Sequence, residues 1–322
     1  QSEFKTPNRT FQVDILVADD FVLTELAGIV DVFMIANRVS VQEVFKWDYF
    51  SINGGPVHSR TRVQVETQTI PDRPAADYMF AIGCSDPDSP ALSLGRHVQA
   101  YTYRNAQVFL LAEAASRYIS EHGARHSALT THWENSALLR ERQGVFDAGS
   151  ALAVEDGRIV TCAGMSSAID IALALIGRHV SSATKMTVAD IMLHEHIRDF
   201  STQQPFSGVR GTNTGDPELD QCIELMSSNI EEPLPINDLV RVLNLSNRSL
   251  ERKFRTYLDT TPNTYYRELR LAKANNLLLN TTLSVQEIGL ACGFGSGFSG
   301  LYKSFFGMTP LAMRKQRRKP LG

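Results

Sequence analysis

The sequence predicts an α/β domain, in which a mostly parallel sheet is sandwiched between helices, followed by a second domain that is all α. Short apolar runs alternate with helical patterns as far as about Phe200, and only helical patterns come later. A polar, glycine-rich segment, Ser201–Asp216, separates the two patterns. We therefore expect domains at residues 1–200 and 217–322, joined by a linker at residues 201–216.

The N-terminal domain begins with Phe11–Ala18, an apolar run suited to a buried strand, and Thr24–Val39 follows with helical spacing. Further strands are predicted at Tyr49–Ile52, Val63–Ile70, Tyr78–Cys84, Gln107–Ala112 and Ala128–Thr130. Helices are predicted at Leu92–Arg104, Ala114–His122 and Trp133–Arg142, and then, after a hairpin at Ser150–Cys162, at Ser166–His179 and Thr184–Phe200. Strands that alternate with helices indicate a flavodoxin-like, mostly parallel sheet covered on both faces.

The C-terminal domain contains the pattern of a short helix, a turn and a helix twice, with one long helix between the two copies. The predicted helices are Pro217–Asn229, Ile236–Leu243, Ser246–Leu258, Pro262–Leu279, Val285–Cys292 and Phe298–Phe306. Ser246 and Ser284 are suited to cap the helices they precede, because a serine oxygen accepts a bond from an otherwise unsatisfied backbone N–H. Gly293 can adopt the left-handed conformation that ends a helix.

Charge is distributed unevenly along the chain. The net charge is -3, yet residues 241–322 hold 14 Lys and Arg against 4 Asp and Glu, a net of +10, so the remainder carries -13. A basic end on an acidic protein indicates a polyanion partner for that end, and the alternative is a solvated basic tail. No apolar run approaches the roughly 18–20 residues of a membrane span, and Gln1–Thr10 lacks the apolar core of a signal peptide. We expect a cytoplasmic protein with no membrane partner.

The four cysteines, Cys84, Cys162, Cys222 and Cys292, are far apart and form no CxxC pair. A disulfide framework or a zinc site is therefore not expected, and the thiols are predicted to be small buried hydrophobic groups. We expect neither a metal nor a cofactor.

The first recognition helix is predicted at Ser246–Tyr257. Its inner face would present Leu250, Phe254 and Leu258 to the core. Its outer face would present five polar side chains to DNA: Asn247, Arg248, Glu251, Arg252 and Arg255. An arginine can bind guanine through two hydrogen bonds, and a glutamate can accept from a cytosine amine. Taken alone, such a helix is more often a solvated charged surface.

The wider pattern resembles the AraC family over Glu218 to Arg318. The matching residues are Ile236-x-Asp238-Leu239, Leu245-Ser246-x-Arg248-x-Leu250-x-Arg252-x-Phe254, Pro262, Tyr265-x-x-x-Leu269-Arg270, Ala272–Leu279, Ile288-x-x-x-Cys292-Gly293-Phe294 and Phe305-Phe306-Gly307-Met308-Thr309-Pro310. This resemblance implies a double helix-turn-helix domain that binds operator DNA, with base contacts from Arg248, Glu251 and Arg252. Two recognition helices set about 34 Å apart would enter successive major-groove segments.

The second recognition helix departs from the family pattern. The stretch between Phe294 and Gly307 is about two residues shorter than in the family, and Gly295, Gly297 and Gly300 are poor helix formers. Few side chains remain to reach DNA: Ser299, Tyr302 and Lys303. We expect this unit to make fewer base-specific contacts than the first. Its contacts with DNA would be mainly to phosphate.

The N-terminal domain is similar to the PfpI-like, class I glutamine-amidotransferase-like fold, in the GlxA-type branch that carries an AraC module behind it. The similarity covers Phe11 to Val180. The matching residues are Gly28-x-x-Asp31-Val32-Phe33, Asp77–Gly83, Leu129-Thr130-Thr131-His132-Trp133, Gly149 and Ile159-x-Thr161-x-Ala163-Gly164-x-x-x-x-Ile169-Asp170.

Active relatives of this fold depend on a cysteine at a sharp strand-to-helix elbow, a histidine about twenty residues later and an acid near the first helix. By this resemblance the elbow position is Ala112, which has no nucleophile. His132 then stands without one, and Asp31 occupies the place where the family usually has Glu. Cys84 and Glu113 are weak substitutes as catalytic groups, so we predict that the domain is not an enzyme and has no catalytic residue.

What remains is a ligand pocket at the carboxyl ends of the strands, where open α/β sheets bind small molecules. The residues expected there are Asp19, Asp20, Asp31, Cys84, Ala112, Glu113, His132 and Trp133. Acidic side chains with an aromatic face from Trp133 and Tyr78 would favour a cation, such as the ammonium of an amino acid or another amine. The alternative is that the aspartates are solvated or cap helices.

Together these patterns predict a ligand-responsive transcription regulator, by resemblance an activator, that binds operator DNA, a small amine or amino-acid derivative, and RNA polymerase. The apolar helix Ser166–His179 would serve a homodimer interface as well as the core. Two alternatives stay open. One is a thiol hydrolase or amidotransferase-like enzyme, and the other is a constitutive DNA-binding protein whose α/β domain only dimerises.

Overall fold

The computed structural model describes residues 9–40, 42–123, 129–136, 139, 150–204 and 214–317. The chain divides into two compact units, residues 1–204 and 205–322, and each is described here by itself. The first unit is α/β and the second is all helical, which confirms the predicted fold class.

One eight-stranded sheet forms the centre of the first unit, in the order β3-β4-β2-β1-β5-β6-β8-β7. The strands are β1 Phe11–Leu16, β2 Phe45–Ser51, β3 Gly55–His58, β4 Gln64–Thr69, β5 Tyr78–Ala81, β6 Gln107–Leu111, β7 Ala153–Asp156 and β8 Ile159–Cys162. The six central strands of this order, β4-β2-β1-β5-β6-β8, are parallel to their neighbours. The two edge strands, β3 and β7, pair antiparallel with β4 and β8.

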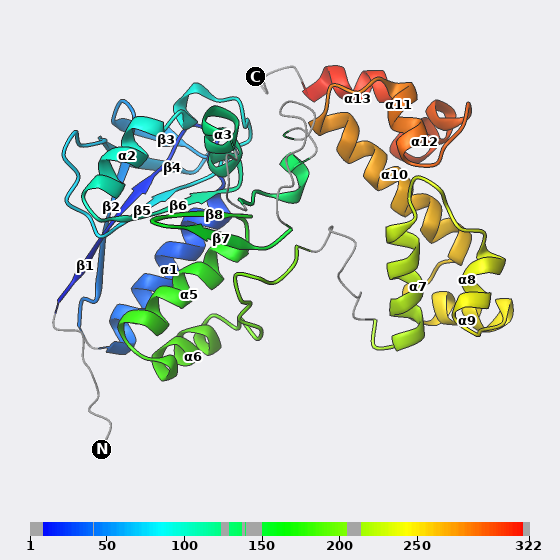
Figure 1. Ribbon diagram of the computed structural model, residues 1–322, viewed down its shortest axis with the longest axis horizontal. Coiled ribbons are helices and arrows are strands. Elements are labelled where there is room, and N and C mark those ends of the chain that lie inside the picture. Colours follow the sequence, from blue (N-terminus) through cyan, green and yellow to red (C-terminus); the bar gives the residue numbers. More distant parts are fainter. Residues whose placement is uncertain are drawn as a thin grey trace. The chain divides into compact units, whose positions relative to one another are not determined.

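Helices cover both faces of this sheet (Figure 1). One face carries α1 Leu23–Ser40, α5 Ser167–His179 and α6 Ser182–Ile191, and the other carries α2 Gly95–Tyr103 and α3 Ala112–His122. Side chains of a strand alternate between the two faces. In β1, Val13 and Ile15 therefore join the core under α1 and α5, while Leu16 joins the core under α2 and α3.

Helix α5 packs most of its apolar surface inside this unit, and the dimer interface expected on this helix stays a prediction. Ile171, Leu173, Leu175 and Ile176 are at most 1% exposed and belong to the core that α1, α6 and the sheet enclose. Among the apolar side chains of α5, only Ile169 and Ala174 are partly exposed.

The structure differs from the sequence analysis at two further places in this unit. Strand β3 was not predicted, because Gly55–His58 contains Pro56 and has a single buried apolar side chain, Val57. The helix expected at Thr184–Phe200 ends at Ile191, since Leu193 adopts a positive φ of 54°. The predicted Trp133–Arg142 helix is described only at residues 133–136 and 139, and the predicted strand at Ala128 also falls partly outside the described residues.

The segment after α6 is fixed to α5 through one buried carboxylate. Asp170 is 2% exposed, and it accepts bonds from His194 Nε2 at 2.8 Å and from the backbone N of Arg198 at 2.9 Å. The Arg198 guanidinium adds bonds of 2.9 and 2.6 Å from Nε and Nη2 to Oδ2. This buried ion pair holds an irregular segment where continued helix was expected.

The second unit consists of α7 Pro217–Ser228, α8 Ile236–Val242, α9 Asn247–Leu258, α10 Pro262–Asn280, α11 Val285–Ala291, α12 Phe298–Phe306 and α13 Pro310–Arg317. The predicted caps are present: Ser246 accepts from Ser249 N, and Ser284 forms a reciprocal capping box with Glu287. Arg270 of α10 donates to the Gly293 carbonyl at 3.0 Å and lies 4.4 Å from the centre of the Phe294 ring. The long helix is thereby bound to the second helix-turn-helix unit.

Among the described residues, no helix combines the length and apolar character that crossing a membrane would require.

Candidate ligand site and nucleic-acid interface

The carboxyl end of β6 turns directly into α3 at Ala112, which adopts a positive φ of 42°. Left-handed backbone at a residue other than glycine is strained, and such strain is concentrated at functional turns. Glycines follow the two neighbouring strands and make room for the turn. A Cβ atom at Gly164 would lie 2.7 Å from the Ala112 Cβ, and one at Gly83 would lie 3.1 Å from it. The chain has therefore kept the strand-to-helix elbow while its side chain is only a methyl group.

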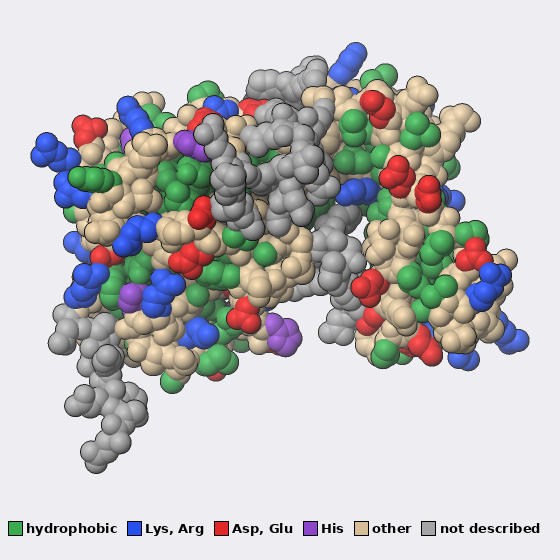
Figure 2. Space-filling model, in the orientation of Figure 1, with side chains coloured by type: hydrophobic (Ala, Val, Ile, Leu, Met, Phe, Trp, Pro, Cys, Tyr) green, Lys and Arg blue, Asp and Glu red, His purple; other side chains and the backbone are tan. Residues whose placement is uncertain are grey.

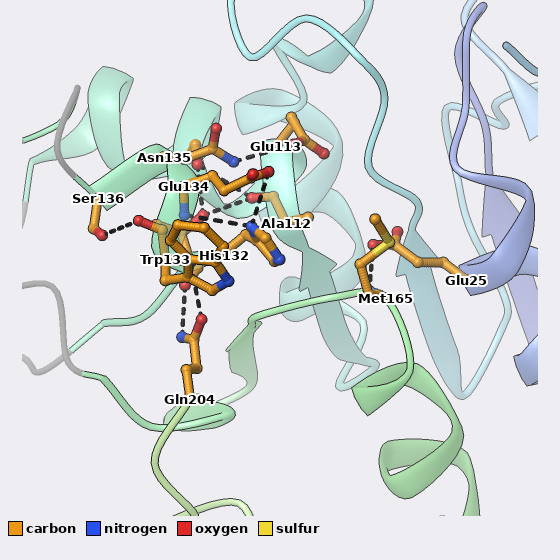
Figure 3. A network of polar contacts seen from close by, with 12 residues as sticks. Glu25, Ala112, Glu113, His132, Trp133, Glu134, Asn135, Ser136, Met165 and Gln204 are labelled. Carbon is orange, nitrogen blue, oxygen red and sulfur yellow. Dashed lines mark hydrogen bonds and ion pairs between the residues drawn. The ribbon is translucent and has the colours of Figure 1, made fainter. Parts of the chain in front are cut away.

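The acid beside this elbow is Glu25 of α1, which the sequence analysis missed (Figure 3). Its side chain is fully buried and accepts bonds of 2.8 Å from the backbone N–H groups of both Gly83 and Met165. A Cβ at Gly164 would lie 2.2 Å from the Glu25 Oε1. Burial raises the pKa of Glu25 to about 8, although the two N–H donors oppose the rise, and the nearby Glu113 adds to it. The protonated form of Glu25 is therefore favoured at neutral pH.

Asp31 does not take this place. It lies six residues further along α1, on the exposed face. Helical spacing places Glu25 on the buried stripe of α1, with Ile29, Val32 and Ala36.

Cys84 is buried and does not behave as a nucleophile. It is 1% exposed, and its thiol donates to the Asp86 carbonyl at 3.1 Å. Burial raises the pKa of Cys84 to about 12, and Glu113 adds to the rise. A thiol rather than a thiolate is present at neutral pH, so it is not activated for attack. Asp19 and Asp20 are exposed, and Asp19 accepts from the His58 backbone N–H at 3.2 Å.

The segment that contains His132 and Trp133 is attached to the elbow through Thr131. The Thr131 hydroxyl donates to the Ala112 carbonyl at 2.8 Å and lies 2.5 Å from the Ser116 hydroxyl. Asn135 Nδ2 in turn donates to Glu113 Oε1 at 3.1 Å. Ala112 and Glu113 are thus connected to the segment that contains His132 and Trp133.

His132 is half-buried, with its ring centre 5.5 Å from that of Trp133 and its Nδ1 3.6 Å from Glu134 Oε2. Burial lowers the pKa of His132, and Glu134 opposes the shift. The histidine is therefore a neutral hydrogen-bonding group at neutral pH.

Gln204, the last residue of the first unit, holds the same segment from the other side (Figure 3). Its side-chain oxygen accepts from Trp133 N at 2.9 Å, and its Nε2 donates to the carbonyls of Thr131 at 2.8 Å and Ala151 at 3.1 Å. The residue is 2% exposed. Gln204 was not predicted, because the polar composition of residues 201–216 indicates a linker.

Tyr78, expected to add an aromatic face to the ligand pocket, lies at the opposite edge of the sheet. It is the first residue of β5, whereas the elbow follows the last residue of β6. Its hydroxyl forms a short hydrogen bond with His179 Nε2.

In the second unit, α9 displays the charged face that was expected of it. Leu250 and Phe254 are fully buried, whereas the five polar side chains predicted to face DNA are all exposed: Asn247, Arg248, Glu251, Arg252 and Arg255. Figure 2 shows Lys and Arg side chains on the surface over α8 and α9. A helix with three exposed guanidinium groups on its outer face can contact phosphates and base edges.

Lys253, on the same helix, has a different use. Its ammonium forms ion pairs with Asp216, at the N-terminus of α7, and with Glu218 at 3.0 Å. These partners raise the pKa of Lys253, and the bond from Lys253 lowers the pKa of Asp216. Lys253 therefore joins α9 to α7 and is not part of the exposed basic face.

The second recognition helix, α12, is poorer in charge. Ser299 and Lys303 are exposed, but Tyr302 is fully buried and its hydroxyl donates to Asn275 of α10. The expectation that Tyr302 reaches DNA is wrong, because its ring is packed between Phe298 and Phe306. The three glycines expected to weaken this helix, Gly295, Gly297 and Gly300, face open space.

Comparison with known proteins agrees with this organisation. The helix-turn-helix domain family matches residues 239–316. The HTH-type transcriptional regulator GbdR of Pseudomonas aeruginosa is 30% identical over 334 residues, which cover 96% of this chain and 85% of that protein. The regulator GlxA of Rhizobium meliloti is 33% identical over 58% of each chain. The crystal structure of an AraC family transcriptional regulator from Pseudomonas putida shares the fold, with a TM-score of 0.50 and 18% identity over 56% of this chain and 99% of that one.

A helix-turn-helix unit with an exposed basic helix, joined to an α/β unit whose elbow has no nucleophile, defines a DNA-binding transcription regulator. The chain belongs to the AraC family, and its relatives and its PfpI-like first unit place it in the GlxA-type branch.

Proposed function

We propose that this chain is a ligand-responsive activator whose first unit senses a small amine or amino-acid-like metabolite beside the elbow at Ala112. The observation that carries the proposal is the set of hydrogen bonds between Gln204 and the backbone of Thr131 and Trp133. Those two residues flank His132, and Gln204 is where the first unit ends. A ligand that contacts His132 or Trp133 would therefore act directly on the start of the connection to the DNA-binding unit.

The chemistry around the elbow favours a cation. The carboxylate of Glu113 accepts a hydrogen bond from Asn135, two residues after Trp133. The indole of Trp133 and the carboxylate of Glu134 both lie near the His132 ring. An ammonium group is attracted both by carboxylates and by the face of an indole ring. The methyl group of Ala112 has no lone pair and cannot act as a nucleophile. A ligand beside the elbow would therefore be bound there without being cleaved.

Thermal denaturation of the full chain with amino acids, betaines, carnitine-like amines and polyamines tests the sensing site. A compound that binds the native state must raise the melting temperature. We expect one cationic class to do so, and we expect the rise to disappear in a His132→Ala, Trp133→Ala double variant. A stabilising cation that acts equally on the double variant would contradict the site. No stabilisation by any cation would favour the reading in which the α/β unit only dimerises.

Gln204→Glu tests the connection, because a carboxylate cannot donate to the Thr131 and Ala151 carbonyls. Gln203→Glu is a matched control, since it makes the same chemical change one residue earlier on a less buried side chain. We expect Gln204→Glu to keep ligand binding and to lose the effect of the ligand on a reporter gene, while Gln203→Glu keeps both. An unchanged reporter response in Gln204→Glu would show that the signal takes another route.

We further propose that the regulator acts as a homodimer and contacts RNA polymerase at its promoters. One double helix-turn-helix domain reads two major-groove segments, and a dimer would extend the site and its selectivity. Light scattering of the chain with ligand and operator DNA measures this directly, and a chain that stays monomeric under those conditions would contradict it.

A further inference from the structure

A pocket lies on the first unit, at the edge of the sheet opposite the elbow. Its volume is about 460 Å³, within the range of pockets that hold small molecules. The amino ends of β1, β5 and β6, the turn before β8 and the end of α5 surround it. Three arginines from three separate parts of the chain line it: Arg9, Arg158 and Arg178.

Two of these guanidinium groups are held by neutral oxygens. Arg158 Nη1 donates to the Asn105 carbonyl at 2.7 Å, and Arg178 Nη1 donates to Gln107 Oε1 at 2.7 Å. Within the described part of the chain, neither arginine has an acidic group within ion-pair distance. Their positions are fixed by hydrogen bonds while their charges are left uncompensated, which is the arrangement of a site prepared for an anion.

Three arginines and two acids, Asp77 and Glu155, line the pocket, so its lining keeps a net positive charge. Asp77 forms an ion pair with Arg9 at 2.6 Å and accepts from Gln12 N at 3.0 Å, and Glu155 accepts from Gln107 Nε2 at 2.9 Å. The wall between them is aromatic. The His179 ring centre is 3.9 Å from that of Phe11, and the Arg9 guanidinium is 4.6 Å from the same ring.

His179 reports the electrostatic character of this pocket. Burial is the main cause of the lowered pKa of His179, and the charges of Arg178 and Arg9 act in the same direction, against a smaller opposing effect of Asp77. A positive local field that disfavours an imidazolium is also one that attracts an anion.

We propose that this pocket binds a small organic anion that carries carboxylate or phosphate groups, with Arg158 and Arg178 as its principal contacts. A guanidinium presents two parallel N–H donors that match two oxygens of either group, and the aromatic wall would accept the apolar part of the ligand. The site is separate from the proposed cation site at the elbow, so the regulator can take a second signal of opposite charge.

The experiment is a titration of the full chain at constant ionic strength with inorganic phosphate, glycerol phosphate, succinate and citrate. Binding is measured by calorimetry and by the change in melting temperature. We expect at least one phosphate or carboxylate ligand to bind, and an Arg158→Gln, Arg178→Gln double variant to bind it at least tenfold more weakly. An Arg60→Gln, Arg73→Gln double variant removes the same net charge at exposed positions outside the pocket and should bind as the wild type does.

A third variant tests the geometry. Arg178→Lys keeps the charge but replaces the planar fork with a single point of attachment, so we expect affinity between those of the wild type and the double variant. Binding that weakens equally in both double variants would show attraction by net charge alone and would overturn the proposal, as would the absence of binding by any of the four anions. The stabilisation by a cation at the elbow should persist in the Arg158→Gln, Arg178→Gln variant. The anion site and the cation site are therefore tested independently of each other.

Discussion

The two units of this chain hold their charged groups in opposite ways. The first unit buries several acids: Asp14 is 5% exposed, Glu25 is not exposed and Asp170 is 2% exposed. The second unit leaves its functional charges in water, with Arg248, Arg252 and Arg255 exposed on the outer face of α9. A buried acid is costly unless it is neutral or hydrogen-bonded, so it specifies structure, whereas an exposed arginine costs little and is available to a partner.

The largest effect expected from this contrast is on DNA binding. An Arg248→Ala, Arg252→Ala double variant should weaken binding to a DNA fragment selected by the wild-type chain by a hundredfold or more, because each base-reading contact contributes about 1–3 kcal/mol. Fluorescence anisotropy with the selected fragment and a scrambled one measures both affinity and selectivity.

Arg267→Ala removes an exposed charge from α10 and is the control for this experiment. Selectivity that survives in the double variant would mean that the exposed face of α9 contacts only phosphates.

The contrast also explains how far the sequence could predict the sites. On α9, the helical period separates Leu250 and Phe254 from the polar side chains, so the exposed face follows from spacing alone. On α1 the same period would place Glu25 on the buried face, but a carboxylate there contradicts the usual rule for acids. Only the fold shows that Gly83 and Met165 supply two backbone donors to it.

Long-range contacts account for most of what the sequence did not reveal. Gln204 lies in a polar segment, and its partners Thr131 and Trp133 are about seventy residues away. The segment after Ile191 leaves the helix because buried Asp170 binds His194 and Arg198, a pairing that no local pattern encodes. The order of strands and helices, by contrast, depends on local periodicity and was predicted for most elements of both units.

In the first unit, Glu25→Gln should destabilise the fold by about 1–3 kcal/mol. The amide nitrogen cannot accept a bond, so one of the backbone donors, Gly83 N or Met165 N, is left buried without a partner. For a unit of this size the melting temperature should fall by about 2–4 °C per kcal/mol.

Calorimetry at pH 7, with Glu66→Gln as an exposed control, measures the effect of Glu25. Equal melting temperatures for wild type and Glu25→Gln would show that the carboxyl group is not needed to satisfy these donors.

Asp14 gives the buried acids a pH signature. Burial raises the pKa of Asp14 from 3.8 to about 6, the bond from Tyr101 opposes the rise, and Asp48 adds to it. Because the folded state holds the proton more tightly, the stability from this group is complete below pH 3.8 and is lost as the pH rises through about 6.

Asp14→Asn keeps an oxygen that can accept from the Tyr101 hydroxyl and cannot ionise. The variant should therefore gain about 1–3 kcal/mol over the wild type between pH 4 and pH 7.5, with little difference at the acid end. Denaturation of wild type, Asp14→Asn and the exposed control Asp72→Asn across this range tests the sign. A gain that does not change with pH would rule out ionisation of Asp14 as its cause.

The smallest effect is expected at α12, where the contrast between buried and exposed charge is weakest. Lys303 is exposed, and the neighbouring glycines and Ser299 offer no second cation on that helix. A lone ammonium that contacts phosphate contributes affinity without sequence information. Lys303→Ala should therefore weaken binding a few fold on the selected and scrambled fragments alike, and lower the slope of log affinity against log salt by about 1. If only the selected fragment loses affinity, Lys303 contacts a base, and α12 reads sequence despite its low charge.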